Sequence, residues 1–297
     1  MSIVLWLLSV LIWVGLLYGL GMVIFVGVSM LTAVVQTREI YDDPKETRYP
    51  RRGYPGGFFA AFKHEIWTMI WVVAGSAVGQ LFYRDREGNR DKTNTQPPVL
   101  FLHGWTETGW HWRWMIRRLR FDRSRRLYTL TFRPIDAPAE HYRRQLEDRI
   151  DAILSATGHE KLTLIGHSFG GLVSRAYLRH NGTAKVERLI TLGTPHGGSV
   201  WAYLFSTPVT RHLRPHGEFL TELTREEKLD GVELVSIATI HDNMVIPFTR
   251  ALHPHSRHIL LHEVGHVGLM VSPQVLAVIR SILFGTPAPS GRDMERS

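Results

Sequence analysis

The chain has 297 residues, a formal net charge of +8 and no cysteine. This length suits one catalytic domain with additional segments. The absence of cysteine excludes disulfides and cysteine-ligated metals. An excess of basic residues is compatible with nucleic acid or with an anionic membrane surface. Because the chain also contains a long apolar segment, we expect a membrane partner and no nucleic-acid partner.

The first 37 residues contain no Asp, Glu, Lys or Arg. An uncharged run of this length exceeds the ~20 apolar residues that cross the ~30 Å hydrocarbon core of a bilayer. A secretory signal peptide, the alternative, has a basic start and a shorter apolar region of roughly 7–15 residues. We therefore predict a transmembrane anchor over residues 1–37 that contacts the bilayer through residues 3–35. The predicted location is an integral membrane protein, with the side of its catalytic domain left open.

A second apolar segment follows a basic loop predicted over residues 38–65. The positive-inside tendency would keep the basic residues of that loop in the cytoplasm. Ile66–Tyr83 is an uncharged stretch of 18 residues, at the lower limit of length for a membrane span. It is compatible with a second span, with an interfacial helix, or with a helix packed on the catalytic domain. We favour contact with the membrane.

The rest of the chain divides at a polar, proline-ending stretch. Residues 84–97 predict a linker, residues 98–286 a catalytic domain, and residues 287–297 a flexible tail. Within the domain, short apolar runs alternate with helical patterns, which predicts crossover units and a small, doubly wound, mostly parallel sheet of the α/β class. The runs are Val99–Leu102, Leu127–Phe132, Leu162–Gly166, Arg188–Leu192, Leu234–Ile240 and His258–Leu261, and the helical stretches are Glu140–Thr157, Phe169–Arg179 and Pro273–Phe284.

Ser168 stands in a G-x-S-x-G motif between an apolar run and a helical pattern. A reactive serine at a sharp strand-to-helix turn needs small residues two positions before and after it, here Gly166 and Gly170. The start of the following helix points backbone N–H groups at the reacting centre. The alternative is a serine that only caps the helix. The flanking pattern favours a nucleophile.

An acid and a base follow the serine in the order that such a nucleophile requires. Asp242 comes directly after an apolar run, where active-site loops gather. His266 lies on a glycine-flanked loop before the last helix. Asp230 is a competing acid, but it precedes its strand. We predict Ser168, Asp242 and His266 as the catalytic residues.

From about Val99 to Phe284 the chain resembles the bacterial lipase and esterase branch of the α/β-hydrolase superfamily. Besides the serine motif, Thr191–Ser199 is similar to the T-x-G-T-P-H-x-G-S stretch of those lipases, and Leu213–Leu220 is similar to their cap segment. The resemblance implies that the backbone amides of Trp105 and Phe169 form the oxyanion hole. About 35 residues after Ser199 leave room for one or two short helices as a lid.

The resemblance and the predicted residues together imply a membrane-anchored serine hydrolase. It would cleave carboxylic esters, most simply lipid-like ones, through an acyl-enzyme and without a cofactor or metal ion. Its partners would be a membrane lipid or ester substrate and the bilayer. An acyltransferase on the same fold stays open, because the two activities differ only in the acceptor that reaches the acyl-enzyme. An inactive binding module is the third alternative.

Two further motifs carry their own alternatives. His262–His266 matches H-E-x-x-H, which in zinc proteases places two histidines on one helical face. Gly265 and the late start of the next helical pattern argue against this interpretation. Between Trp105 and Arg126, tryptophans alternate with arginines, which is typical either of a lipid interface or of a packed helix with a solvated basic face.

Overall fold

The computed structural model describes residues 3–42, 57–87, 95–121, 124–225, 227 and 229–286. Two long helices come first, α1 (Ile3–Asp42) and α2 (Phe58–Phe82). The elements that follow are β1 (Val99–Leu102), η1 (Gly109–Trp112), α3 (Arg113–Leu119), β2 (Leu127–Leu130), α4 (Ala139–Thr157), β3 (Leu162–His167), α5 (Phe169–Asn181), β4 (Val186–Leu192), η2 (Val200–Tyr203), α6 (Pro208–His212), α7 (Glu218–Thr224), β5 (Glu233–Thr239), η3 (Phe248–Ala251), β6 (Arg257–Leu261), η4 (Val267–Val271) and α8 (Pro273–Phe284).

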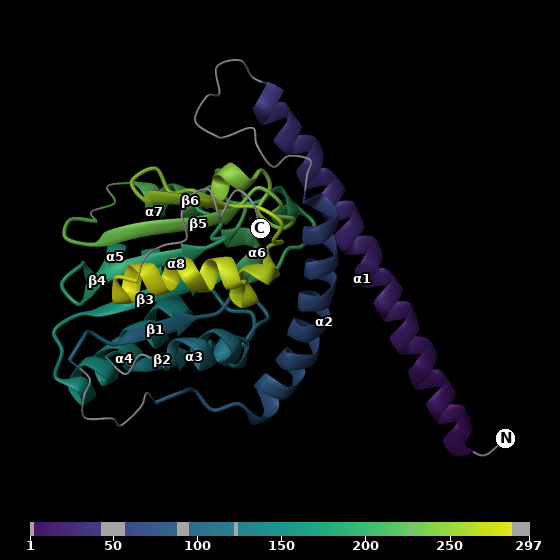
Figure 1. The fold of residues 1–297 in the computed structure, drawn as a ribbon, viewed down its shortest axis with the longest axis horizontal. Coiled ribbons are helices and arrows are strands. Elements are labelled where there is room, and N and C mark those ends of the chain that lie inside the picture. The colour runs from purple at the N-terminus through teal and green to yellow at the C-terminus, as the bar shows by residue number, and fades with distance from the viewer. Residues whose placement is uncertain are drawn as a thin grey trace.

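The six strands form one parallel sheet in the order β2-β1-β3-β4-β5-β6 (Figure 1). Each strand falls on one of the six apolar runs identified in the sequence, so the predicted α/β class and doubly wound sheet are confirmed. The chain runs outward from the middle of the sheet in both directions. The order therefore changes direction between β1 and β3, where ligand sites of open parallel sheets are found.

Each face of the sheet is covered by its own set of helices. Alternate side chains of a strand point to opposite faces. Leu100 and Leu102 of β1 accordingly join a core with α4 and α5, while Val99 and Phe101 join a second core with α3 and α8. Burial on both faces explains why the strands are continuous apolar runs in the sequence.

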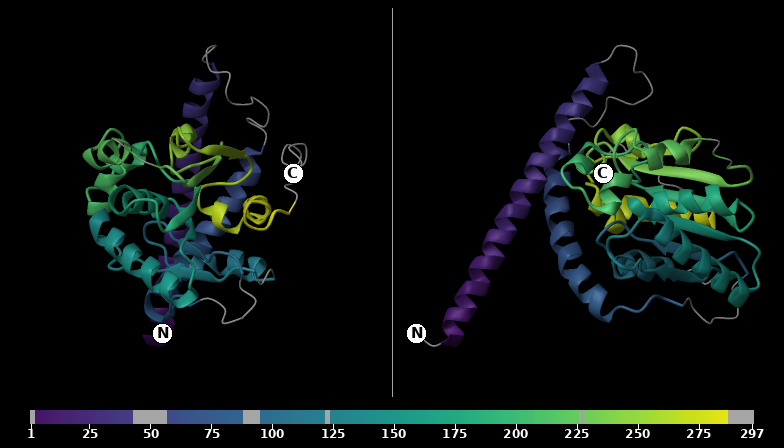
Figure 2. Two further views of the ribbon diagram at one scale, coloured as in Figure 1. Left: turned by 90° about the vertical axis from the view of Figure 1, so that its left-hand side faces the viewer. Right: turned by 180° about the vertical axis from the view of Figure 1, so that it is seen from behind.

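Helix α2 lies beside the carboxyl ends of the strands and contacts η1 and η4, the segments that follow β1 and β6 (Figures 1 and 2). Gly75 and Gly79 allow this close approach, since a Cβ on Gly75 would lie 2.2 Å from the Trp110 ring. His111 donates a hydrogen bond from Nε2 to the Val72 carbonyl, 3.0 Å away. Of the three alternatives for this segment, the structure shows the third: α2 packs on the α/β domain. Large apolar side chains elsewhere on the helix are exposed.

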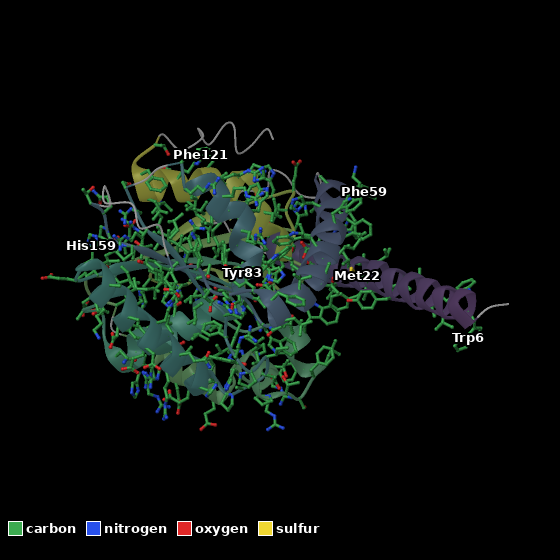
Figure 3. The ribbon with its side chains drawn as sticks, turned by 90° about the horizontal axis from the view of Figure 1, so that it is seen from below. Trp6, Met22, Phe59, Tyr83, Phe121 and His159 are labelled. Atoms are coloured by element: carbon green, nitrogen blue, oxygen red, sulfur yellow. The ribbon has the colours of Figure 1, made fainter. Side chains whose placement is uncertain are left out.

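Helix α1 packs on the outer side of α2 through its second half, where Val26, Met30 and Ala61 are buried together. Its first half projects away from the domain, with Trp6 near the far end (Figure 3). Leu17–Arg38 and Phe58–Phe82 are both long and apolar enough to cross a membrane. A buried core helix or a signal sequence meets the same criterion, so length and composition alone do not distinguish them.

Several predicted boundaries differ from the structure. The loop predicted over residues 38–65 is shorter, because α1 continues to Asp42 and α2 begins at Phe58. The charged residues before Ile66 do not end the helix, since Glu65 has buried partners. The predicted linker over 84–97 begins with residues that pack on the domain: Asp85 accepts hydrogen bonds from the backbone and side chain of Thr131. The tail predicted over 287–297 lies outside the described residues.

The central strand supports the site, so shortening one of its side chains should destabilise the fold. Ile165 is fully buried in β3. We expect Ile165→Ala to lower the free energy of unfolding by about 2–5 kcal/mol, because it leaves a cavity. Ile135→Ala, the same change at a half-exposed position, should stay within about 0.5 kcal/mol of the wild type. Denaturant unfolding followed by tryptophan fluorescence measures both, and equal effects would contradict the assigned core.

Candidate active site

Ser168 occupies the turn between β3 and α5 with a positive φ of 49°. This conformation is strained for a residue with a side chain, and such residues cluster at functional sites. The flanking glycines have no room for a side chain. A Cβ on Gly166 would lie 2.6 Å from the Gly171 nitrogen, and one on Gly170 would lie 2.7 Å from the His103 carbonyl oxygen. The spacing seen in the sequence thus follows from close packing of the turn.

Asp242 and His266 meet at the carboxyl edge of the sheet. The His266 ring donates a hydrogen bond from Nδ1 to Oδ2 of Asp242, 3.0 Å away. The other carboxylate oxygen, Oδ1, accepts the backbone N–H groups of Met244 and Val245 at 2.9 and 2.7 Å. The backbone of its own loop therefore fixes the Asp242 carboxylate, and the carboxylate orients the imidazole of His266. Nε2 of the ring is left available for a reacting group.

Opposing effects set the pKa of His266. Burial alone lowers it, but the charge and hydrogen bond of Asp242 outweigh burial, and Glu65 and Glu107 add to them, so the pKa is raised. A histidine acts as a general base only when it is neutral. The raised pKa therefore moves the onset of base function to higher pH.

Ser168 and His266 line the same cavity of about 220 Å³. Its walls are mostly apolar and come from η2, the α6 region and both N-terminal helices, which contribute Phe25, Met69 and Val72. The serine and the histidine thus lie on one face of the fold, as a shared reaction requires. A larger surface cavity of about 830 Å³ lies between α4, α5 and α7, but none of the predicted site residues lines it.

The loop after β1 comes close to the serine. A Cβ on Gly104 would lie 3.1 Å from the Cβ of Ser168. Trp105, the next residue, lines the cavity. Phe169 is the first residue of α5, and the N–H groups of a helix's first turn have no carbonyl partner within the helix. The two predicted oxyanion donors therefore flank Ser168, and their role stays a prediction.

The sequence pattern of the α/β hydrolase fold matches residues 97–214. The structure also resembles that of the mature Bacillus licheniformis lipase BlEst2, with a TM-score of 0.59 and 18% identity over 67% of this chain and 97% of that one. The chain has the α/β-hydrolase fold. Aspergillus fumigatus lipase B shares the fold at a TM-score of 0.55 and 15% identity, over 67% of this chain and 55% of that lipase.

Relatives by sequence match smaller parts of the chain. A triacylglycerol lipase of Pseudarthrobacter phenanthrenivorans is 47% identical over 58 residues, which are 20% of this chain and 18% of that lipase. Epoxide hydrolase 4 of Homo sapiens is 30% identical over 140 residues, 44% of this chain and 36% of the relative. The chain thus matches less than a fifth of the length of the lipase and little more than a third of the epoxide hydrolase.

A buried carboxylate beside the nucleophile, that of Glu107, was not predicted. The Glu107 carboxylate accepts the Gly104 N–H at 2.7 Å and lies 3.1 Å from Nδ1 of His167, the residue before Ser168. Burial alone would raise the pKa of Glu107, but His167 and the hydrogen bonds lower it to about 2. Glu107 thus ties the loop after β1 to the end of β3. No local pattern marks it, because its partner lies 60 residues away.

Two further side chains, which the sequence did not reveal, accept hydrogen bonds from the backbone of the loop that carries His266. Asn243 accepts the backbone N–H of His266 at 3.2 Å. Glu65, from α2, accepts the N–H groups of Val267 and Gly268 at 3.0 Å each. No local pattern marks Glu65, because the amides that it binds lie 202 and 203 residues further along the chain.

The competing assignments fare differently. Asp230 lies away from the site, and its carbonyl accepts a hydrogen bond from Thr183. His262–His266 does not form a helix, because η4 begins only at Val267, so the two histidines do not share a helical face. In the stretch of alternating tryptophans and arginines, Trp112 is fully buried and Trp110 packs against Trp71 of α2. Packing, rather than lipid contact, accounts for these two rings.

His103 follows β1 and contacts both its own turn and the end of the neighbouring strand β2. Its Nε2 accepts the Phe132 N–H at 2.9 Å, and its Nδ1 lies 2.7 Å from the Gly104 carbonyl oxygen. Burial lowers the pKa of His103 to about 4, which keeps the ring neutral. This fits a residue that shapes the turn.

Asp242→Asn should separate the acid from its competitor. The oxygen of the new amide would still accept from Met244 and Val245, which turns its NH₂ group toward His266 and favours the wrong tautomer of the ring. We expect kcat for ester hydrolysis to fall about 10³- to 10⁴-fold, as in serine proteases, and any residual acid limb of kcat/KM to move to lower pH, because the charge that raises the pKa of His266 is lost. Asp230→Asn is the matched control and should leave both unchanged. Steady-state kinetics across pH measures this, and equal losses in the two variants would contradict the assignment.

Proposed function

We propose that this chain is a membrane-associated serine hydrolase that cleaves carboxylic esters through Ser168, His266 and Asp242. One observation carries the proposal: a serine in a strained strand-to-helix turn and an imidazole oriented by a buried carboxylate open into the same apolar cavity. The lipase and esterase likenesses in sequence and fold support the same class of reaction.

In this proposal the reaction is acyl transfer in two steps. Nε2 of His266 takes the proton of the Ser168 hydroxyl as its oxygen attacks the ester carbonyl. The amides of Trp105 and Phe169 hold the oxyanion, and each such donor contributes about 2.7–4 kcal/mol to the transition state. His266 then returns the proton to the leaving alcohol. Water, activated by the same imidazole, releases the acid from Ser168.

The cavity favours a substrate with an apolar chain. Its walls combine Phe25, Met69 and Val72 from the N-terminal helices with Leu213 and Val245 from the domain. A site of this volume accommodates the acyl portion of an ester next to the serine, while few polar groups are available for a charged substrate. We therefore assign lipid-like esters as the substrate class.

The outer faces of the N-terminal helices support association with a bilayer. Large apolar side chains are exposed along both helices, and a soluble monomer rarely leaves a continuous patch of this kind uncovered. They are Trp6, Val10, Trp13, Leu17, Tyr18, Leu20, Val23, Ile24, Val28, Leu31 and Val35 on α1, and Phe59, Trp67, Ile70, Val73, Val78, Leu81 and Phe82 on α2. Because α2 also borders the cavity, the same helices would bring the active site to the lipid.

Ser168→Ala tests the nucleophile. We expect hydrolysis of a short-chain p-nitrophenyl ester to fall by about 10³-fold or more, since no other group replaces the attacking oxygen. Ser155→Ala, the same change at an exposed position of α4, should retain wild-type activity. Initial rates in detergent measure both variants. Full activity in Ser168→Ala would contradict the proposal.

The substrate class predicts a dependence on the lipid phase. We expect kcat/KM to rise at least about tenfold when a long-chain ester is presented in vesicles rather than as a monomeric short-chain ester, because the apolar helices concentrate the enzyme where the substrate is. Rates on vesicles and on soluble ester measure this, with enzyme in the same detergent as the control. Equal rates would remove the lipid assignment while leaving esterase activity intact.

A further inference from the structure

Glu65 is a carboxylate without exposure to solvent, carried by the largely apolar helix α2. Its Oε1 accepts the Val267 N–H and its Oε2 accepts the Gly268 N–H, both at 3.0 Å. These two amides follow His266 directly in the chain and open the short helix η4. The side chain thus reaches from α2 into the backbone of the loop that carries the proposed base.

The fit between α2 and this loop leaves no spare room. A Cβ on Gly265 would lie 2.4 Å from Oε2 of Glu65, and one on Gly268 would lie 2.5 Å from Nδ1 of His64. The glycines on both sides of His266 are therefore required by the approach of α2. The position of the loop and the position of the helix depend on each other.

The backbone of His266 itself is held from two further directions. Its N–H is accepted by Asn243, and its carbonyl accepts Nε2–H of His167 at 3.1 Å. Asn243 also donates to the hydroxyl of Ser29 on α1 at 3.1 Å. Three successive peptide groups around His266 are thus hydrogen-bonded, to Asn243 after β5, to His167 at the end of β3 and to Glu65 on α2. Of these three residues, only Glu65 lies outside the α/β domain.

Capping alone does not require a carboxylate at this place. Amides at a helix start are commonly satisfied by Ser, Thr, Asn or Asp close in sequence or by water. A buried carboxylate instead carries a desolvation cost of several kcal/mol unless nearby groups offset it. The groups that face the His266 ring are Asp242, His167, Glu107 and Glu65, while His64 lies beside Gly268. These three carboxylates, of Asp242, Glu107 and Glu65, stabilise the protonated form of the His266 imidazole.

We infer that Glu65 is a positioning residue for the general base: it fixes the peptide groups after His266 and stabilises the imidazolium that forms when Ser168 gives up its proton. The apolar helix α2 is therefore part of the catalytic apparatus and not only an anchor. This inference rests on the proposed hydrolase function.

Glu65→Gln tests the inference, because it keeps the size of the side chain while removing its charge and one acceptor. In the full-length protein in detergent, we expect kcat/KM on a soluble ester to fall about ten- to hundredfold. The loss should lie in kcat, and KM should stay within about twofold of the wild-type value. The acid limb of the pH profile should move to lower pH, because the charge of Glu65 contributes to raising the pKa of His266. Glu65→Asp retains the charge, so its acid limb should lie closer to the wild type. Lys63→Gln, a charge change on the exposed side of the same helix, should match the wild type.

The outcomes separate this inference from the function beneath it. A wild-type protein without esterase activity would overturn the proposed function, and the inference with it. With an active wild type, a Glu65→Gln profile that overlays the wild type would overturn the inference alone. So would a drop in activity that follows thermal instability and leaves the acid limb in place in both Glu65 variants, because Glu65 would then only support the fold.

Discussion

The hydrogen bond between His266 and Asp242 is the interaction on which the rest of the site depends. Both side chains are almost completely buried, and a polar group in such a place must find its partner within the protein. Each oxygen of the Asp242 carboxylate is occupied, one by the ring and one by two backbone amides. The imidazole therefore has one orientation available, and His266 lines the same cavity as Ser168.

Holding that orientation requires contributions from distant parts of the chain. The turn after β5 supplies Asp242 and Asn243, the end of β3 supplies His167, and α2 supplies Glu65. Each contact crosses between elements: those of Asp242, Asn243 and His167 lie within the α/β domain, and that of Glu65 requires α2 to pack against it. The strain at Ser168 and the burial of three carboxylates are unfavourable on their own, and the two apolar cores on the faces of the sheet supply the stability that offsets them. Both N-terminal helices thus have two faces with different tasks, one against the active-site loops and one toward the surroundings.

Features that depend on neighbouring residues could be predicted from the sequence. The six strands were visible because burial on both faces makes them apolar throughout, and the turn at Ser168 because Gly166 and Gly170 leave no alternative to close packing. Asp242 and His266 followed from their order after strands. Glu65, Glu107 and Asn243 could not be found in this way, since their partners are up to about 200 residues distant. The start of α2 was predicted at Ile66 rather than at Phe58 for the same reason. The charged residues before Ile66 suggested a boundary, but Glu65 has buried partners within the fold and the helix includes it.

The most direct measurement of the central claim is peptide mapping by mass spectrometry after treatment with a fluorophosphonate. This reagent forms a stable bond to a serine only where a base withdraws its proton and an oxyanion hole receives the phosphoryl oxygen. We expect one adduct, on the peptide that contains Ser168, and its rate of formation should rise with pH as His266 becomes neutral. An adduct on a different serine, or ester hydrolysis that continues while Ser168 stays unmodified, would contradict the account.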